Sequence, residues 1–180
     1  MLITHIALLR GINVGGKNKL PMKDLAAIFQ DAGCANVRTY IQSGNVLFDA
    51  SARVLARLPR SVHVTIKKRF GYDVPVVVRS SIQLEEIIRK NPFVKRGEDE
   101  SFLHVMFLAD TPPSTLVKQL DNHRSDPDEF VVRGPDIYLR LPNGAAKTKL
   151  TNAYFDSKLK AVSTGRNWRT VKKLAELAGT

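Results

Sequence analysis

The spacing of apolar residues predicts four short elements in the first 50 residues. An apolar run over 3–10, ended by Gly11, predicts a buried strand. From Pro21 the apolar positions recur at helical spacing until Gly33, which predicts a helix with a glycine stop. Short strands are expected at 37–41 and 46–49, joined by a turn at 43–45 because Gly and Asn tolerate positive φ.

Two further elements complete this half of the chain. Residues 51–70 show helical periodicity interrupted by Pro59, so one bent or broken helix is expected before Gly71. The β-branched run 74–79, with Pro75 near its start, predicts a strand that lies at a sheet edge or has the proline at its first position. The order is therefore β-α-β-β-α-β, in which two helices cover one face of an antiparallel sheet.

The remaining residues repeat most of this order. The pattern predicts a helix over 82–90 stopped by Asn91-Pro92, a strand over 102–108 and a helix from Thr111-Pro112 to about residue 123. Strands are expected at 129–133 and 137–141, followed by a helix over 148–159. A short closing strand at 162–164 and a terminal helix through Val171, Leu174 and Leu177 end the chain's predicted elements. We therefore expect an α+β fold of two ferredoxin-like halves with helices on one face of each antiparallel sheet. The halves are residues 1–80 and residues 81–180, the second with an extra terminal helix. The repeat rests on element order, since sequence identity between the halves is faint.

The net charge of the chain suggests an anionic partner. The net charge is +11, with 12 basic and 4 acidic side chains in 1–80, 8 and 11 in 81–142, and 8 and 2 in 143–180. Two basic ends would attract anions such as nucleic-acid phosphates or a small acidic ligand. The alternative is that the charge serves solubility alone, since it is screened beyond about 10 Å at ordinary salt.

Composition and length exclude several classes of protein. With 43% apolar and 25% charged residues, the chain has globular composition. Its longest nearly apolar run, 102–109, is far shorter than the roughly 20 residues of a membrane span. The N-terminus lacks the cationic start of a signal peptide, and a single cysteine, Cys34, cannot form an internal disulfide. We expect a cytoplasmic protein without a membrane partner.

The segment 11–18 resembles a phosphate-binding loop but departs from it at one position. Two glycines stand five apart and Lys17 follows the second, yet Asn18 has no hydroxyl for magnesium and the helix expected from Pro21 starts too late. A nucleotide-hydrolysing loop is therefore not expected. What remains is a loop whose backbone N–H groups, with Lys17, Lys19 and Arg10, suit an anion.

The densest polar segment is 164–170, where a tight turn is expected to precede a helix. Asn167 can cap that helix, leaving Arg166 near its positive dipole end, which suits an anion. The alternative is a cap beside a tryptophan in the core. Arg10 could likewise pair with Asp49 or Asp73 for stability, and Asn13 and Asn45 could make ordinary turn hydrogen bonds.

Other chemistry has little support in the sequence. The four histidines, His5, His63, His104 and His123, show no ligand spacing, so neither a metal site nor a cofactor is expected. Cys34 is expected to be a buried or inert thiol, and no nucleophile elbow is present, so catalytic residues are unknown. The split β-α-β-β-α-β order also suggests an RNA-recognition module, but aromatic residues for base stacking are missing from its central strands.

Three ordered motifs carry a family resemblance. They are Ala7 to Asn18 (ALLRGINVGGKN), Arg38 to Asn45 (RTYIQSGN) and Thr164 to Val171 (TGRNWRTV). Together they closely resemble the family catalogued as domain of unknown function 1697. The resemblance implies a bacterial-type α/β protein with two ferredoxin-like halves and implies no activity. The family's recurrent polar positions fall on Arg10, Gly11, Asn13, Ser43, Asn45, Arg166, Asn167 and Thr170. Arg169 stands where many relatives have asparagine.

The leading hypothesis is a pocket for an anionic ligand, either nucleic acid or a phosphorylated or carboxylated metabolite. Its candidate residues are Arg10, Gly11, Asn13, Lys17, Lys19, Ser43, Asn45, Arg166, Asn167 and Thr170. A small-molecule enzyme using the same pocket and a structural or interaction protein without a ligand are the alternatives. The sequence indicates no oligomeric state.

Overall fold

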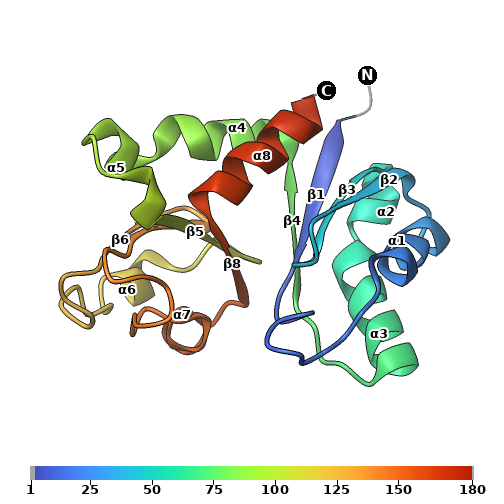
Figure 1. The fold of residues 1–180 in the computed structure, drawn as a ribbon, viewed down its shortest axis with the longest axis horizontal. Coiled ribbons are helices and arrows are strands. Elements are labelled where there is room, and N and C mark those ends of the chain that lie inside the picture. Colours follow the sequence, from blue (N-terminus) through green and yellow to red (C-terminus); the bar gives the residue numbers. More distant parts are fainter. Residues whose placement is uncertain (1–2, 180) are drawn as a thin grey trace. The chain divides into compact units, whose positions relative to one another are not determined.

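A computed structural model of the chain describes residues 3–179 (Figure 1). These residues form two compact units, which we call unit 1 (residues 3–85 and 174–179) and unit 2 (residues 86–173). Each unit contains one four-stranded antiparallel sheet with helices, so the expected α+β class with two split β-α-β halves is confirmed.

The sheet of unit 1 has the strand order β2-β3-β1-β4. Its strands are β1 (Thr4–Leu9), β2 (Ala35–Tyr40), β3 (Asn45–Asp49) and β4 (Val76–Ser80), and its helices are α1 (Met22–Asp31), α2 (Ala52–Leu55), α3 (Leu58–Phe70) and the start of α4 (Ser81–Lys90). Strand β4 lies at an edge, as Pro75 predicted, because proline has no N–H for a second neighbouring strand.

Helices α1 and α3 cover one face of this sheet (Figure 1). Alternate strand residues, such as Ala7 and Leu9, point toward Leu25 and Phe29 of α1, because side chains of a strand alternate between its faces. The rings of Phe29 and Phe48 lie 5.4 Å apart within this core. The residues that point to the opposite face are also buried, namely Ile6, Leu8, Leu47 and Val77.

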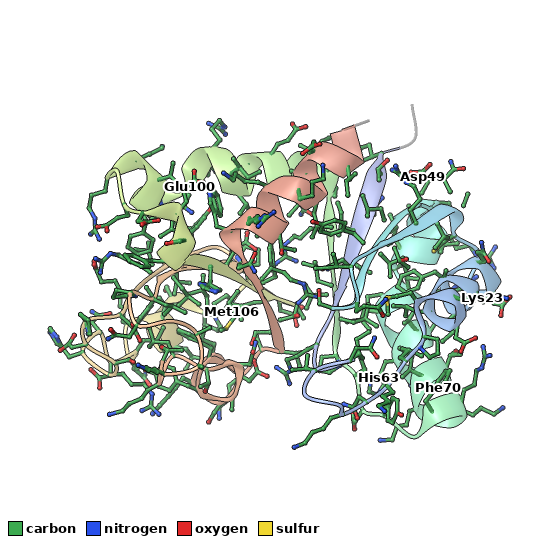
Figure 2. The ribbon with its side chains drawn as sticks, viewed as in Figure 1. Lys23, Asp49, His63, Phe70, Glu100 and Met106 are labelled. Atoms are coloured by element: carbon green, nitrogen blue, oxygen red, sulfur yellow. The ribbon has the colours of Figure 1, made fainter. Side chains whose placement is uncertain are left out.

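Unit 2 repeats the arrangement with the strand order β6-β7-β5-β8. Its strands are β5 (Leu103–Leu108), β6 (Glu129–Arg133), β7 (Asp136–Arg140) and β8 (Ser163–Asn167), and its helices are α5 (Pro92–Lys95), the 3-10 helix η1 (Glu100–Phe102), α6 (Ser114–Val117), α7 (Asn152–Leu159) and the start of α8 (Trp168–Gly179). Met106, labelled in Figure 2, packs with Tyr154 and Phe155 of α7 in the core of this unit.

The pairing of β1 with β4 in unit 1 has the same register as the pairing of β5 with β8 in unit 2. Ile6 of β1 faces Arg79 of β4, and at the equivalent place Val105 of β5 faces Arg166 of β8. One position earlier stand His5 and His104, each the second residue of its strand. The repeat inferred from element order therefore extends to strand pairing.

The helix expected to reach about residue 123 is much shorter than predicted. Helix α6 ends at Val117, and residues up to 127 form turns. Asp121 explains part of the difference: its carboxylate accepts a hydrogen bond from the backbone N–H of His123, at 2.9 Å, and its own N–H donates to the Tyr154 hydroxyl, at 3.0 Å. Such local side-chain bonds compete with helical hydrogen bonding.

The boundaries near the C-terminus were also predicted wrongly. The expected turn before the last helix is strand: β8 continues to Asn167, with Gly165 paired to Met106. Helix α7 starts at Asn152, after Thr151 caps it, rather than at residue 148. Residues 51–70, by contrast, form two helices, α2 and α3, interrupted at Ala56 and Arg57, so the expected broken helix is present and its break falls shortly before Pro59.

Across residues 3–179, the helices are too short or too polar for any of them to span a bilayer.

Candidate functional site

The candidate residues fall into two groups, one in each unit. Arg10, Gly11, Asn13, Lys17, Lys19, Ser43 and Asn45 belong to unit 1, and Arg166, Asn167 and Thr170 belong to unit 2. In unit 1, hydrogen bonds tie Asn13 and Asn45 into the loop and turn that carry the other candidates, and in unit 2 a hydrogen bond joins Asn167 to Thr170.

In unit 1, the loop between β1 and α1 is held in shape by asparagine side chains. The Asn13 amide donates to the carbonyls of Leu20, at 2.9 Å, and Gln42, at 3.0 Å, while its oxygen accepts the Leu20 N–H at 2.8 Å. Asn18 donates to the Gly11 carbonyl at 2.8 Å. We call residues 10–19 the basic loop; Asn13 ties it to the β2–β3 turn.

That turn is itself tightly built. The buried Asn45 amide donates to the Tyr40 carbonyl, at 3.1 Å, and to the Ser43 hydroxyl, at 2.9 Å. Gly44 has φ +79°, and its carbonyl accepts the N–H of Leu9 at 2.9 Å. Asn45 does not take the positive φ expected of it; Ile41 does, at 49°.

The three cations of the basic loop differ in how far they are exposed. Lys17 and Lys19 are exposed, and no ion pair with an acidic side chain is formed by either lysine within residues 3–179. Arg10 is half-buried. Helix α1 begins only at Met22, after Pro21, so the helix terminus does not follow Lys17 directly as a phosphate-binding loop requires.

In unit 2, Arg166 lies within β8 and is buried. Its guanidinium donates to the Thr164 hydroxyl, at 3.0 Å, and to the Gly165 carbonyl, at 2.7 Å. Burial lowers the pKa of Arg166 to about 10, so the group remains cationic at neutral pH.

Asn167 and Thr170 form the cap of α8. The Asn167 side-chain oxygen accepts the Thr170 N–H at 2.8 Å, and Trp168 is buried beside it. Both features of the alternative interpretation, a cap and a core tryptophan, are therefore present.

Arg166 and Asn167 also line a cavity of about 320 Å³. Val105, Met106 and Leu150 form apolar parts of its wall, and polar side chains such as those of Thr148 and Asn152 also line it. Further lining residues are His104, Leu139, Leu141, Ala145, Thr151 and Gly165. A cavity of this size can hold a small ligand.

His104 also lines this cavity, and the sequence analysis did not include it among the candidates. It is half-buried, its Nδ1 lies 3.4 Å from the Phe102 carbonyl oxygen, and it faces Asn167 across the β5–β8 pair. Burial lowers the pKa of His104, so the imidazole is neutral at neutral pH and can accept a proton. Its place in an apolar strand, matching His5 in the other half, was the signal available.

Comparison with solved structures supports the fold. A structure described as that of conserved bacterial protein SP0830 from Streptococcus pneumoniae is similar, with a TM-score of 0.70, 22% sequence identity and coverage of 99% of each chain. At that identity the likeness concerns the fold alone. A family model described as a protein of unknown function (DUF1697) matches residues 2–138, and no curated protein matches the chain.

Proposed function

This chain belongs to the DUF1697 family of proteins of unknown function, and we propose that it binds the phosphate groups of an anionic ligand on the basic loop of unit 1. The observation that carries this proposal is the charge of the loop. Residues 10–19 contain Arg10, Lys17 and Lys19 and no acidic side chain. Such a segment attracts anions at a distance and contacts phosphates directly.

The scaffold around these cations supports a binding role. Asn13 holds the loop to the β2–β3 turn, so the lysines extend from an ordered backbone. Beside them Val14 and Ile41 are 61% and 50% exposed, although both are large and apolar. Ile41 is β-branched with φ 49°, a conformation that costs roughly 1–2 kcal/mol. Strained backbone positions cluster at active sites, ligand clamps and switch regions.

Nucleic acid is the ligand class to test first. Exposed lysines gain little from one screened phosphate, whereas a strand offers several phosphates in a row. The contact would be to the backbone, because the sheet faces that RNA-recognition modules use for stacking are buried here, as Leu8 and Phe107 illustrate. The proposal places the protein in the cytosol, consistent with one cysteine, Cys34, which is buried.

The test is fluorescence anisotropy of labelled single-stranded RNA, single-stranded DNA and duplex DNA with the full chain over a salt series. The logarithm of the affinity should fall by about 0.7 to 0.9 per logarithm of salt for each phosphate contacted. The double variant Lys17→Ala/Lys19→Ala should lower this slope by roughly two contacts.

A matched control removes the same charge elsewhere in unit 1. Arg60→Ala/Lys68→Ala takes two exposed cations from α3 and should leave the slope unchanged. An equal loss in both double variants, or no binding at low salt, would contradict the proposal and assign the charge to solubility.

A small-molecule site, with or without catalysis, is the second candidate function. The unit 2 cavity favours it, because His104 can accept a proton there and Arg166 can stabilise negative charge. Thermal-shift screening of phosphorylated and carboxylated metabolites tests it: a shift that disappears in His104→Gln supports the cavity. If neither assay detects a ligand, the remaining hypothesis is a structural or interaction protein that binds no ligand.

A further inference from the structure

A second cavity in unit 2, of about 350 Å³, lies between two loops that the structure joins firmly. The Arg124 Nε donates to the Lys149 carbonyl at 3.1 Å, and the Lys149 N–H donates to the Ser125 hydroxyl oxygen at 2.9 Å. The walls include Arg124, Ser125, Asp128, Asn143, Lys147 and Lys149. The cavity is therefore preformed by hydrogen bonds between residues 124–125 and residue 149.

Asp128 lines this cavity, and one of its carboxylate oxygens has no hydrogen-bond partner within residues 3–179. The residue is only 5% exposed, and its Oδ2 accepts the Ser125 hydroxyl at 2.7 Å. Its Oδ1 is buried and has no hydrogen-bond partner within residues 3–179. A buried carboxylate oxygen without a donor is costly, so a ligand that brings an N–H group would be favoured.

Arg124 provides a flat surface beside that acceptor. Its guanidinium carbon lies 4.1 Å from the centre of the Tyr154 ring, and the bond to Lys149 fixes its plane. Tyr154 is held in turn by the Asp121 N–H, at 3.0 Å. Because Arg124 is exposed and lines the cavity, its second face is available to a planar ligand, and guanidinium planes stack well on nucleobases.

Cations complete the site. Lys147 and Lys149 are exposed and line the same cavity, where their ammonium groups suit a phosphate. Asp126, the other acidic residue of the wall, is paired with His123 at 3.3 Å. Asp128 can therefore accept hydrogen bonds from a ligand, and the two lysines can contact its phosphate.

We propose that this cavity binds a guanine nucleotide. Guanine offers two adjacent donors, N1–H and the 2-amino group, to the Asp128 carboxylate, while its ring stacks on Arg124 and its phosphate contacts Lys147 and Lys149. The site shares no residue with the basic loop, so this proposal and the proposed function stand or fall separately.

The test measures binding to the full chain by isothermal titration calorimetry. The probes are guanosine 5′-monophosphate, inosine 5′-monophosphate, guanosine and inorganic phosphate. Inosine monophosphate lacks the 2-amino group and should bind about tenfold more weakly, since a hydrogen bond to a charged group is lost. A 5′-phosphorylated oligonucleotide beginning with G is compared with the free nucleotide. The comparison shows whether the guanine nucleotide that the cavity binds is free or stands at the 5′ end of a strand.

Variants assign the binding to the cavity. In Asp128→Asn, the side-chain oxygen can still accept the Ser125 hydroxyl, which leaves an NH₂ group facing the donors of guanine. Affinity should fall by about tenfold or more. Asp110→Asn makes the same change of charge at an exposed residue of unit 2 that does not line the cavity and should leave affinity within about twofold.

The lysines are tested in the same way. Lys147→Ala/Lys149→Ala should weaken the nucleotide about tenfold without weakening guanosine, because only the phosphate contact is removed. The exposed pair Lys118→Ala/Lys158→Ala in the same unit is the control. No binding of either guanine-bearing probe, phosphate binding as tightly as the nucleotide, or equal effects of Asp128→Asn and Asp110→Asn would overturn the proposal.

Discussion

Asparagine side chains take the place of backbone hydrogen-bond partners in the loops of unit 1. Asn13 satisfies the carbonyls of Leu20 and Gln42, and Asn45 satisfies that of Tyr40. Loop backbone groups near a core need partners, and a short amide supplies a donor and an acceptor together. At these two positions the side-chain amides hold the loop and the turn of the candidate site in shape, and Lys17 and Lys19 of the basic loop stay exposed.

Gly44 is the position in unit 1 where a side chain is least tolerated. A Cβ there would lie 2.8 Å from the Leu9 Cβ and 3.0 Å from the Ile12 Cδ1, and φ is +79°. Gly44→Ala should lower the free energy of unfolding by about 3 kcal/mol, from overpacking and backbone strain together. Urea denaturation measures the loss.

Gly97→Ala separates these two causes. Gly97 has the same φ of +79°, but a Cβ at this position would meet no atom within 4 Å among the described residues. Only the strain applies, and the expected loss is about 1 kcal/mol. Equal losses at Gly44 and Gly97 would show that the contact with Leu9 costs nothing.

At the scale of elements, β8 passes into α8 without a linker. Asn167 pairs with His104 as the last residue of the strand and caps the helix through Thr170. Trp168, the first helical residue, is buried. Asn167 therefore ends a strand, caps a helix and lines the 320 Å³ cavity. Its position is compatible with both a structural and a ligand-binding role of this segment.

The cap of α8 makes a measurable contribution. Asn167→Ala removes the acceptor for the Thr170 N–H and should lower stability by about 1 kcal/mol, whereas Asn167→Asp keeps the acceptor and should retain most of it. Thermal unfolding followed by circular dichroism compares the two. A stability loss in the aspartate variant as large as in the alanine variant would contradict the capping role.

At the scale of the whole molecule, the repeat places equivalent groups in both units. His5 and His104 occupy matching strand positions, as do Arg79 and Arg166, and both arginines donate to the carbonyl of the preceding residue, at 3.0 and 2.7 Å. In both histidines burial lowers the pKa. The environment of each histidine is thus set by the shared architecture.

These histidines make stability depend on pH in mild acid. The folded chain binds their protons less readily than the unfolded chain, whose histidines titrate near 6.5, so stability is full above that pH and falls as the pH drops below it. Urea denaturation should give a lower free energy of unfolding at about pH 5.5 than at about pH 7.5. The pKa values of Glu86, Glu98 and Asp99 are lowered, so these carboxylates stay ionised across that range.

The variant His5→Gln/His104→Gln should flatten this pH dependence. Gln30→Ala/Gln119→Ala, at two exposed residues that do not titrate, serves as the control and should leave it unchanged. A pH dependence that persists in the histidine double variant would assign the effect to other groups.

The sequence was sufficient to predict most elements and their order. Local periodicity located β1, α1 and β4, and the glycines at 33 and 71 ended helices as expected, with φ of +96° and +77°. The same local signals identified the basic loop and the polar segment at 164–170. These features depend on residues close in the chain, so a single sequence reveals them.

Tertiary structure decided what depends on distant residues. Pairing with β5 extended β8 to Asn167, and the contact with Tyr154 helped to replace the helix expected around Asp121 with turns. The cavities, the burial of His104 and the unpartnered oxygen of Asp128 likewise arise from segments far apart in sequence. The chain's local pattern determined its elements and its charges, whereas strand pairing and packing determined which polar groups remain available to a ligand, because hydrogen-bond partners are assigned only when the elements meet.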